Sequence, residues 1–224
     1  MFAIKNLSKV YTSQHGTVRA LDDICLTIER GSFIAVTGGS GSGKTTLLLT
    51  LGGLIRPTSG SVSFLETPMY AMSEPELAEY RNRKIGFVLQ TFNLIPYLTA
   101  IENVMLPMIF NSNRNGTSQL LAEELLQKVG LKDRKEHLPR ELSVGQQQRV
   151  AIARALANSP DVILADEPTG NLDPTLSLEV LNILKRLNEE EGRTVIMVTH
   201  SPEAACFGSK QLHLKDGKIA DRLN

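Results

Sequence analysis

Residues 38–53 read GGSGSGKTTLLLTLGG, a glycine-rich stretch that turns abruptly into a run of leucines. An apolar run predicted to be a strand precedes the stretch, and a predicted helix follows it. Residues 38–45 fit the pattern G-x-x-x-x-G-K-[S/T], in which glycines let consecutive N–H groups turn inward around an anion. The helix adds the positive end of its dipole. A flexible surface loop would not explain this placement, so the pattern predicts a phosphate-binding loop.

The side chains of this loop have expected roles toward a nucleotide. Lys44 is expected to reach the β- and γ-phosphates as a compact cation, and the Thr45 hydroxyl to ligate Mg²⁺. The leucines that follow are expected to bury the helix and so hold its N-terminus at the ligand. The predicted nucleotide-binding residues of the loop are Gly38, Gly39, Ser40, Gly41, Ser42, Gly43, Lys44, Thr45 and Thr46. A phosphate loop alone does not distinguish a kinase, a GTPase or a motor.

The composition is that of an ordinary soluble globular protein, with 224 residues of which 42% are hydrophobic and 21% charged. The 24 basic residues equal the 24 acidic ones, so no broad basic face and no nucleic-acid partner are expected. No apolar stretch is long enough to cross a bilayer, and the N-terminus lacks the order of a signal peptide. We therefore expect a cytoplasmic protein whose membrane connection runs through a partner. Cys25 and Cys206 lack metal-like spacing and are expected to be reduced thiols in the core.

Three short runs are continuously apolar, at residues 32–38, 161–166 and 194–200. Strands buried on both faces of a parallel sheet have this pattern. An apolar stripe at helical spacing follows Asp173, a predicted N-cap, and Pro174 at the first turn. Alternating strands and helices predict an α/β architecture. The N-terminal part instead alternates apolar residues between turn-forming pairs, which predicts further β structure.

The middle of the chain, residues 92–158, lacks strand-like runs and contains helical patterns, one of which ends at Gly130 as a C-cap. We interpret this part as a helical subdomain inserted into the α/β core. The whole chain, residues 1–224, is then one domain whose core comprises residues 1–91 and 159–224.

A second motif, VILADEP at residues 162–168, ends a buried strand with two adjacent carboxylates. Side chains alternate along a strand, so the two carboxylates can take different roles. Asp166 suits the Mg²⁺ shell, usually through water, and Glu167 suits the orientation and polarisation of an attacking water. The alternative is an ordinary strand end that reaches solvent.

The segment LSVGQQQR at residues 142–149, a few residues before VILADEPTGNLD, resembles the signature segment of ABC-type ATPases. The other motifs stand in the family's order, and the resemblance spans nearly the whole chain. It implies a P-loop NTPase fold of the ABC nucleotide-binding type, with an N-terminal antiparallel β subdomain and an inserted α-helical subdomain. It also implies an ATPase that uses ATP and Mg²⁺.

Further site residues follow from this resemblance. Gln90, in GFVLQTFNL, stands where the family joins the core to the helical subdomain and senses Mg²⁺ and the membrane partner. Asp173, in NLD, matches the D-loop, and His200 matches the switch histidine that contacts the γ-phosphate. Tyr11 matches the aromatic residue that stacks on adenine. Taken singly, Gln90, His200 and Tyr11 would be a loop glutamine, a strand-end histidine and a strand tyrosine, and stacking suits GTP as well as ATP.

The resemblance implies that two copies of the chain close around two ATP molecules. Each ATP lies between the 38–46 loop of one copy and the segment Ser143–Gln146 of the other, whose Ser143 and Gly145 contact the γ-phosphate. Val144 stands where the family has a glycine. It would loosen the contact if the backbone there required a positive φ, and we predict that it is tolerated. Across the site, the predicted catalytic residues are Lys44, Glu167 and His200, and the predicted metal ligands are Thr45, Gln90 and Asp166.

The segments GFVLQTFNLIPYLTAIENVMLPMIF and ADEPTGNLD most resemble ATPase subunits of the lipoprotein-release, macrolide-efflux and cell-division group. Members pair with membrane subunits that have few spans and a large extracytoplasmic domain, which would hold this chain on the cytoplasmic face of the inner membrane. The partner is expected to dock around residues 90–107, on Phe92, Leu94, Ile95 and Tyr97, unless these side chains pack inside the subdomain.

Three other functions remain open on the sequence. The cell-division type regulates a periplasmic hydrolase through its membrane partner without transport, and its ATPase sequence is similar to that of the transport ATPases. An importer subunit often adds a C-terminal regulatory domain, and none is expected after Asn224. A soluble ABC ATPase of DNA repair or translation would carry coiled-coil insertions, tandem domains or basic stretches, which the sequence lacks. The residues do not identify a cargo.

Overall fold

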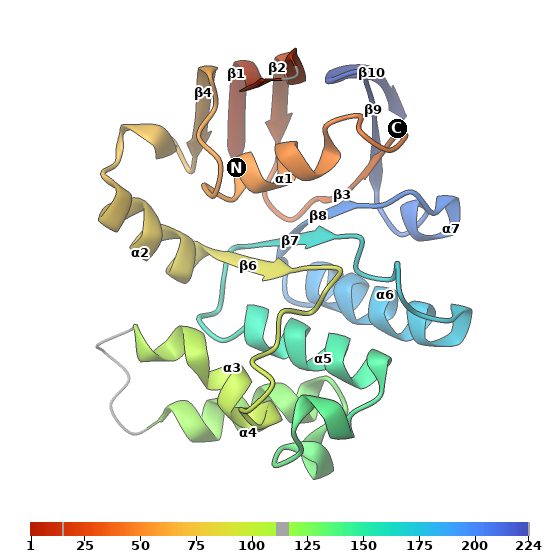
Figure 1. Cartoon of the computed structure of the whole chain (residues 1–224). Helices are drawn as coiled ribbons and strands as arrows, with labels where there is room; N and C mark the ends of the chain where they lie inside the picture. Colours follow the sequence, from red (N-terminus) through yellow and green to blue (C-terminus); the bar gives the residue numbers. More distant parts are fainter. Residues whose placement is uncertain (15, 111–116, 224) are drawn as a thin grey trace.

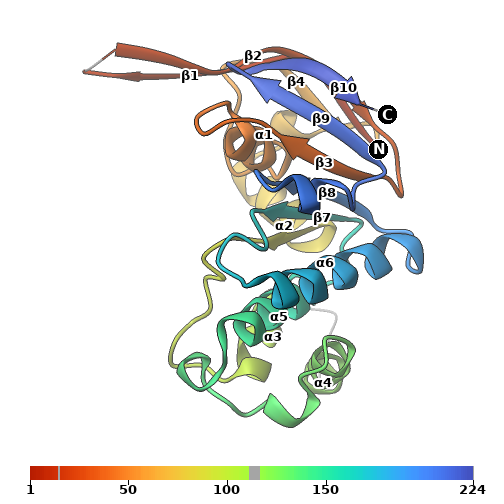
Figure 2. The same ribbon diagram turned by 90° about the vertical axis from the view of Figure 1, so that its right-hand side faces the viewer.

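The computed structural model describes residues 1–14, 16–110 and 117–223, and its strands form two sheets (Figure 1). The first sheet is antiparallel and has the strand order β2-β1-β4-β5. Its strands are β1 (Phe2–Ser13), β2 (Gly16–Ile28), β4 (Ser59–Phe64) and β5 (Thr67–Pro68). The predicted N-terminal antiparallel β structure is therefore confirmed. β1 and β2 extend together well beyond the rest of this sheet (Figure 2).

The second sheet runs through the centre of the molecule in the order β10-β9-β3-β8-β7-β6. Its strands are β3 (Phe33–Thr37), β6 (Ile85–Val88), β7 (Val162–Asp166), β8 (Thr194–Val198), β9 (Lys210–Lys215) and β10 (Lys218–Leu223). Neighbouring strands are parallel, except that β10 is antiparallel to β9. The three apolar runs predicted as buried parallel strands are β3, β7 and β8, and every residue of β8 is buried. That prediction is confirmed.

Helices cover both faces of the central sheet. They are α1 (Lys44–Leu51), α2 (Glu74–Lys84), α3 (Ala100–Ile109), α4 (Ser118–Lys128), α5 (Val144–Ala155), α6 (Pro174–Glu189) and α7 (Pro202–Ala205). Short 3-10 turns occur at Met69–Ala71, Lys132–Arg134 and Pro139–Glu141. Asp173 caps α6 as predicted, by accepting the N–H groups of Thr175 and Leu176. Gly130 stands just after α4 with a φ of 73°, which suits the end of a helix.

Each face of the central sheet has its own apolar core, because successive strand residues point to opposite faces. On one face, Ile163 and Ala165 of β7 pack with α3, α4, α5 and α6. On the other face, Val162 and Leu164 pack with α1 and the antiparallel sheet. The central sheet thus lies between the helices and the antiparallel sheet, and α1 is held between the two sheets (Figure 1).

The expectation that both thiols lie in the core is wrong. Cys25 and Cys206 are both exposed. On β2 the buried Ile24 faces the core, so its neighbour Cys25 points to the other side, and Cys206 directly follows the short surface helix α7. In the part of the chain that the structure describes, none of the helices combines the length and apolarity needed to span a membrane.

Candidate functional site

The glycine-rich stretch connects the end of β3 to the first residue of α1. A Cβ atom on Gly38 would lie 2.2 Å from the carbonyl oxygen of Leu214, and one on Gly43 would lie 2.2 Å from that of Ala20. Both glycines also have positive φ, 148° and 102°, so these two positions require glycine. No side chain among the described residues caps α1 at Gly43. The first N–H groups of the helix therefore remain available to an anion.

The loop borders a cavity of about 270 Å³, which residues 41–46 and Ala20 of β2 line. Lys44 is buried, and its Nζ donates to two carbonyls of the loop itself at 2.8 and 2.9 Å. The buried Ser42 Oγ has no hydrogen-bond partner among the described residues. A cation, an open helix end and an unpaired hydroxyl together fit the phosphates of a nucleotide. Ala20 is a site residue that the sequence analysis did not predict.

Thr45 lies against the carboxylate that ends β7. Its Oγ1 donates to Oδ1 of Asp166 at 3.1 Å. Burial is the main cause that raises the pKa of Asp166; the Thr45 hydrogen bond and Lys44 oppose this rise, and Glu167 adds to it. A hydroxyl and a carboxylate oxygen in contact are ligands of the kind that Mg²⁺ prefers. The structure thus brings together two of the predicted metal ligands.

Replacing Asp166 by asparagine is expected to stabilise the protein without added ligand. The pKa of Asp166 is higher in the folded state than in the unfolded state. Between these two pKa values the folded state binds more protons than the unfolded state. The free energy of unfolding therefore falls as the pH rises from the lower pKa through the higher one. Asparagine keeps an acceptor for Thr45 without the buried charge. The melting temperature at pH 7.5 should therefore rise, and a gain of ~1 kcal/mol in the free energy of unfolding would be seen as a rise of roughly 2–4 °C at this chain length. The gain should shrink as the pH falls toward 4.

Asp173→Asn is the matched control for this measurement, because asparagine caps a helix as well as aspartate and the melting temperature should not change. An Asp166→Asn variant that melts at or below the wild-type temperature at pH 7.5 would contradict the destabilising role given to this carboxylate.

Glu167 and His200 meet just after the ends of β7 and β8. Glu167 follows β7 with a φ of 45°, a conformation that few residues with side chains adopt. Its Oε2 lies 2.9 Å from His200 Nδ1 and accepts the His200 N–H at 3.3 Å. The pair lines a cavity of about 510 Å³ whose apolar wall includes Leu178 and Phe207. A carboxylate able to accept a proton and an exposed histidine therefore share one space at the carboxyl edge of the sheet.

The signature segment forms the start of α5. Ser143 caps this helix: its Oγ accepts the Gln146 N–H at 3.3 Å, and its N–H donates to Gln146 Oε1 at 2.9 Å. Gly145 is buried, and a Cβ there would lie 2.9 Å from the side chain of Leu176. Val144 is the first helical residue and is not among the described residues with positive φ. The strain considered for Val144 is therefore absent.

For two of the predicted site residues, Gln90 and Tyr11, the contacts found among the described residues are with residues outside the loop. Gln90 follows β6, and its carbonyl accepts a hydrogen bond from Asn171 Nδ2 at 3.1 Å, so it packs on the segment after Glu167. Tyr11, on β1, is 42% exposed and has Lys9 Nζ 5.1 Å from its ring centroid. Tyr11 pairs with β2, the strand that brings Ala20 to the cavity. Among the described residues, no hydrogen bond or ion pair joins the signature segment to the loop.

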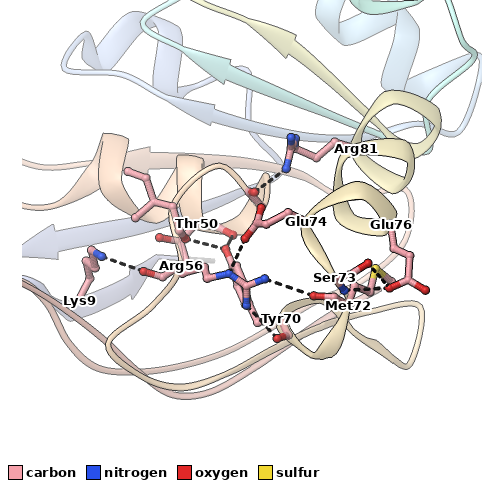
Figure 3. A network of polar contacts seen from close by, with 11 residues as sticks. Lys9, Thr50, Arg56, Tyr70, Met72, Ser73, Glu74, Glu76 and Arg81 are labelled. Atoms are coloured by element: carbon pink, nitrogen blue, oxygen red, sulfur yellow. Dashed lines mark hydrogen bonds and ion pairs between the residues drawn. The ribbon is translucent and has the colours of Figure 1, made fainter. Parts of the chain in front are cut away.

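A polar network fastens the C-terminal end of α1 (Figure 3). The Tyr70 hydroxyl donates to the carbonyl of Thr50 at 2.5 Å, and Arg81 Nη1 donates to that of Gly53 at 2.8 Å. Burial raises the pKa of Tyr70, so its hydroxyl remains a donor. A cation near the C-terminal carbonyls also favours the helix dipole. These contacts fix the helix whose other end faces the cavity.

The chain matches the family model described as ABC transporter over residues 21–170. Two curated relatives are similar over nearly all of it. MacB of Syntrophobacter fumaroxidans, a macrolide export ATP-binding/permease protein, is 46% identical over 98% of this chain and 31% of that protein. LolD of Bordetella pertussis, a lipoprotein-releasing system ATP-binding protein, is 42% identical over 96% of this chain and 93% of that protein.

A solved structure has the same fold. It is the dimeric post-hydrolysis state of the ATP-binding cassette MJ0796 of Methanocaldococcus jannaschii, bound to ADP and Pi. It matches with a TM-score of 0.92 and 44% identity, over 99% of this chain and 97% of that chain. The predicted fold class is confirmed.

Proposed function

Because the chain belongs to the ABC transporter family and is one of its ATPases, we propose that it binds ATP at residues 38–46 and uses hydrolysis to drive a membrane partner. One observation carries this proposal: three groups converge at the carboxyl edge of the central sheet. They are the open loop with its buried Lys44, the Thr45–Asp166 pair and the Glu167–His200 pair.

Binding is proposed to begin at the loop. Lys44 would exchange its two carbonyl acceptors for phosphate oxygens, and the unpaired Ser42 hydroxyl and the N–H groups at the start of α1 would complete the contacts. Tyr11 is an exposed side chain of β1 and is proposed to stack on adenine. Mg²⁺, held by Thr45, Asp166 and Gln90, would neutralise charge on the β- and γ-phosphates.

Hydrolysis is assigned to the pair at the end of β7 and β8. Glu167 would orient a water molecule and accept its proton as the water oxygen attacks the γ-phosphorus and ADP leaves. The contact between His200 and Glu167 holds the imidazole beside the same space, where it is proposed to contact the γ-phosphate. Charge on the γ-phosphate must be neutralised from more than one side, and this chain supplies only one side.

A second copy of the chain is proposed to supply the other side. Ser143, Gly145 and Gln146 would contact the ATP held by the opposite copy, while Asp173 would lie at the joint between the copies. Two ATP molecules would then be enclosed in a homodimer from which water is excluded. Closure on binding and opening after hydrolysis would be the motion that the partner receives.

The partner is proposed to be a permease, because MacB is named as an ATP-binding protein and a permease in one. That this permease has few spans and a large extracytoplasmic domain is proposed from the resemblance of the sequence to the lipoprotein-release and macrolide-efflux group. Such a partner would hold the chain on the cytoplasmic face of the inner membrane, with residues 92–158 acting as a helical subdomain. Of the apolar side chains proposed for docking, Tyr97 is 76% exposed, whereas Leu94 packs against the core. Tyr97 is therefore the strongest candidate for direct contact. Whether the motion exports a substrate, releases lipoproteins or regulates a hydrolase depends on this partner.

Recovery of the partner tests the proposed function. A tagged Glu167→Gln variant would be purified from native membranes in mild detergent with ATP and Mg²⁺, and its companions identified by mass spectrometry. A membrane protein with few spans and a large external domain is expected, and membranes without the tagged chain serve as control. Recovery of ribosomal or DNA-bound factors without a membrane protein would contradict the proposal.

Val144→Gly is expected to change ATP turnover by less than about twofold. Val144 adopts ordinary helical backbone at the first position of α5 and is 45% exposed, so a glycine there relieves no strain. The steady-state rate of phosphate release and the KM for ATP measure the effect. A several-fold gain in rate with unchanged affinity would show instead that Val144 impairs the site.

A further inference from the structure

The turn between β9 and β10 touches the phosphate loop from outside. The N–H of Gly217, in this turn, donates to the carbonyl of Ser42 at 3.1 Å. The carbonyl of Gly217 in turn accepts the N–H of Asp22 on β2 at 2.9 Å. β10 runs beside β2 in this region (Figure 2). One residue thus ties the middle of the loop to the antiparallel sheet through backbone atoms alone.

The carbonyl of Ala20 lies against both the loop and the turn. A Cβ on Gly43 would lie 2.2 Å from this oxygen, and a Cβ on Gly217 would lie 3.0 Å from it. Gly217 is also buried and has a φ of 75°. Both glycines leave room for the same carbonyl. A side chain at position 217 would therefore be in tight contact with this oxygen, and either β2 or the turn with its bond to Ser42 would have to shift by a few tenths of an ångström.

Side-chain contacts around the turn are weaker anchors. Asp22 pairs with Arg19 at 2.7 Å and with Lys218 at 3.2 Å, and both cations are well exposed. Exposed ion pairs of this kind add little stability. The backbone bonds of Gly217 are therefore firmer contacts than these ion pairs. They add to the pairing of β9 with β3, which places the start of the turn beside the start of the loop.

From these contacts we infer that Gly217 is a positioning residue for phosphate binding, which holds the Ser42 carbonyl so that the loop keeps its binding shape. This inference rests on the proposed assignment of residues 38–46 to phosphate binding. The loop needs left-handed backbone at Gly41 and Gly43, with φ of 76° and 102°. A loop held in that shape beforehand loses less conformational entropy when its ligand binds.

Gly217→Ala tests the inference, with Gly31→Ala as matched control. Gly31 has a φ of 74°, so alanine meets the same backbone strain there, but its Cβ would contact only Gly192 O at 3.7 Å. Calorimetry would give the Kd for ATP and for inorganic tripolyphosphate. Gly217→Ala should weaken the binding of ATP and of tripolyphosphate by about tenfold each, which is the effect of losing one anchoring hydrogen bond. Its kcat at saturating ATP should stay within about twofold of wild type, and Gly31→Ala should keep both Kd values.

Several results would overturn the inference. These are wild-type affinity in Gly217→Ala, an equal loss in Gly31→Ala, or a loss for ATP without one for tripolyphosphate. Should the alanine variant not fold, Gly217→Asn replaces it, because asparagine tolerates positive φ yet carries the same Cβ, and the same loss is expected. Wild-type protein that binds neither ligand would overturn the proposed function as well.

Discussion

Replacing Glu167 by glutamine is expected to lower ATP hydrolysis by at least about 100-fold, the scale of a lost general base. Glutamine has nearly the same shape and can keep a hydrogen bond to His200, but it does not accept a proton from water. Lys44 and Thr45 are untouched, so ATP should still bind. Phosphate release measures the loss, and retention of labelled ATP after rapid gel filtration shows that binding survives.

Glu203→Gln is the matched control for this variant. Glu203 lines the same cavity as Glu167 but accepts the Ser201 hydroxyl at 2.7 Å and has no proposed role in hydrolysis. Its turnover should stay within about twofold of wild type. Normal turnover in Glu167→Gln would remove the role given to Glu167 and leave Asp166 and His200 as the groups to examine.

Lys44→Met is expected to weaken ATP binding by at least about 100-fold. Methionine keeps the apolar stem in its buried position but removes the cation, and two charge-assisted hydrogen bonds to phosphate together account for a loss of this size. Fluorescence of a bound nucleotide analogue gives the Kd. The rate of hydrolysis at subsaturating ATP should fall as the affinity for ATP falls.

Lys135→Met serves as the control for Lys44→Met. Lys135 pairs with Glu123 at 2.7 Å on the helical side of the molecule, far in sequence from the loop. The Lys135→Met variant loses the same charge as Lys44→Met and should leave the Kd for ATP unchanged. An Lys44→Met variant that folds and binds ATP as tightly as wild type would place the phosphates elsewhere in the structure.

Much of the fold could be predicted because its decisive elements have strong local signals. β3, β7 and β8 are short, continuously apolar runs, and α6 begins with an aspartate and a proline. α2 has no such signal, since Leu77 is its one buried residue and its charges give no apolar stripe. The thiols were misplaced because burial of Cys25 depends on which face of β2 it occupies, and composition does not tell the two faces apart.

In the candidate site, too, some residues have a clear signal in the sequence and others have none. Lys44, Thr45, Asp166 and Glu167 could be proposed as site residues because the chemistry of phosphate and metal binding needs those residue types beside a strand and a helix. Ala20 contributes a carbonyl, which any residue type supplies. Gly217 has the ordinary sequence context of a hairpin turn, which does not indicate a contact with the loop. The contact of His200 with Glu167 joins residues far apart in the sequence, and the sequence did not predict it. The order of motifs in the family pointed to His200 alone, as a residue that contacts the γ-phosphate.

ATP-driven pairing of two chains is tested by the mass of the Glu167→Gln variant in solution, measured by light scattering with and without ATP and Mg²⁺. We expect the mass of one chain without nucleotide and of two chains, with two bound nucleotides, when ATP is present. A mass of one chain at saturating ATP would contradict this pairing, because the Ser143–Gln146 segment would then have no opposite ATP to contact.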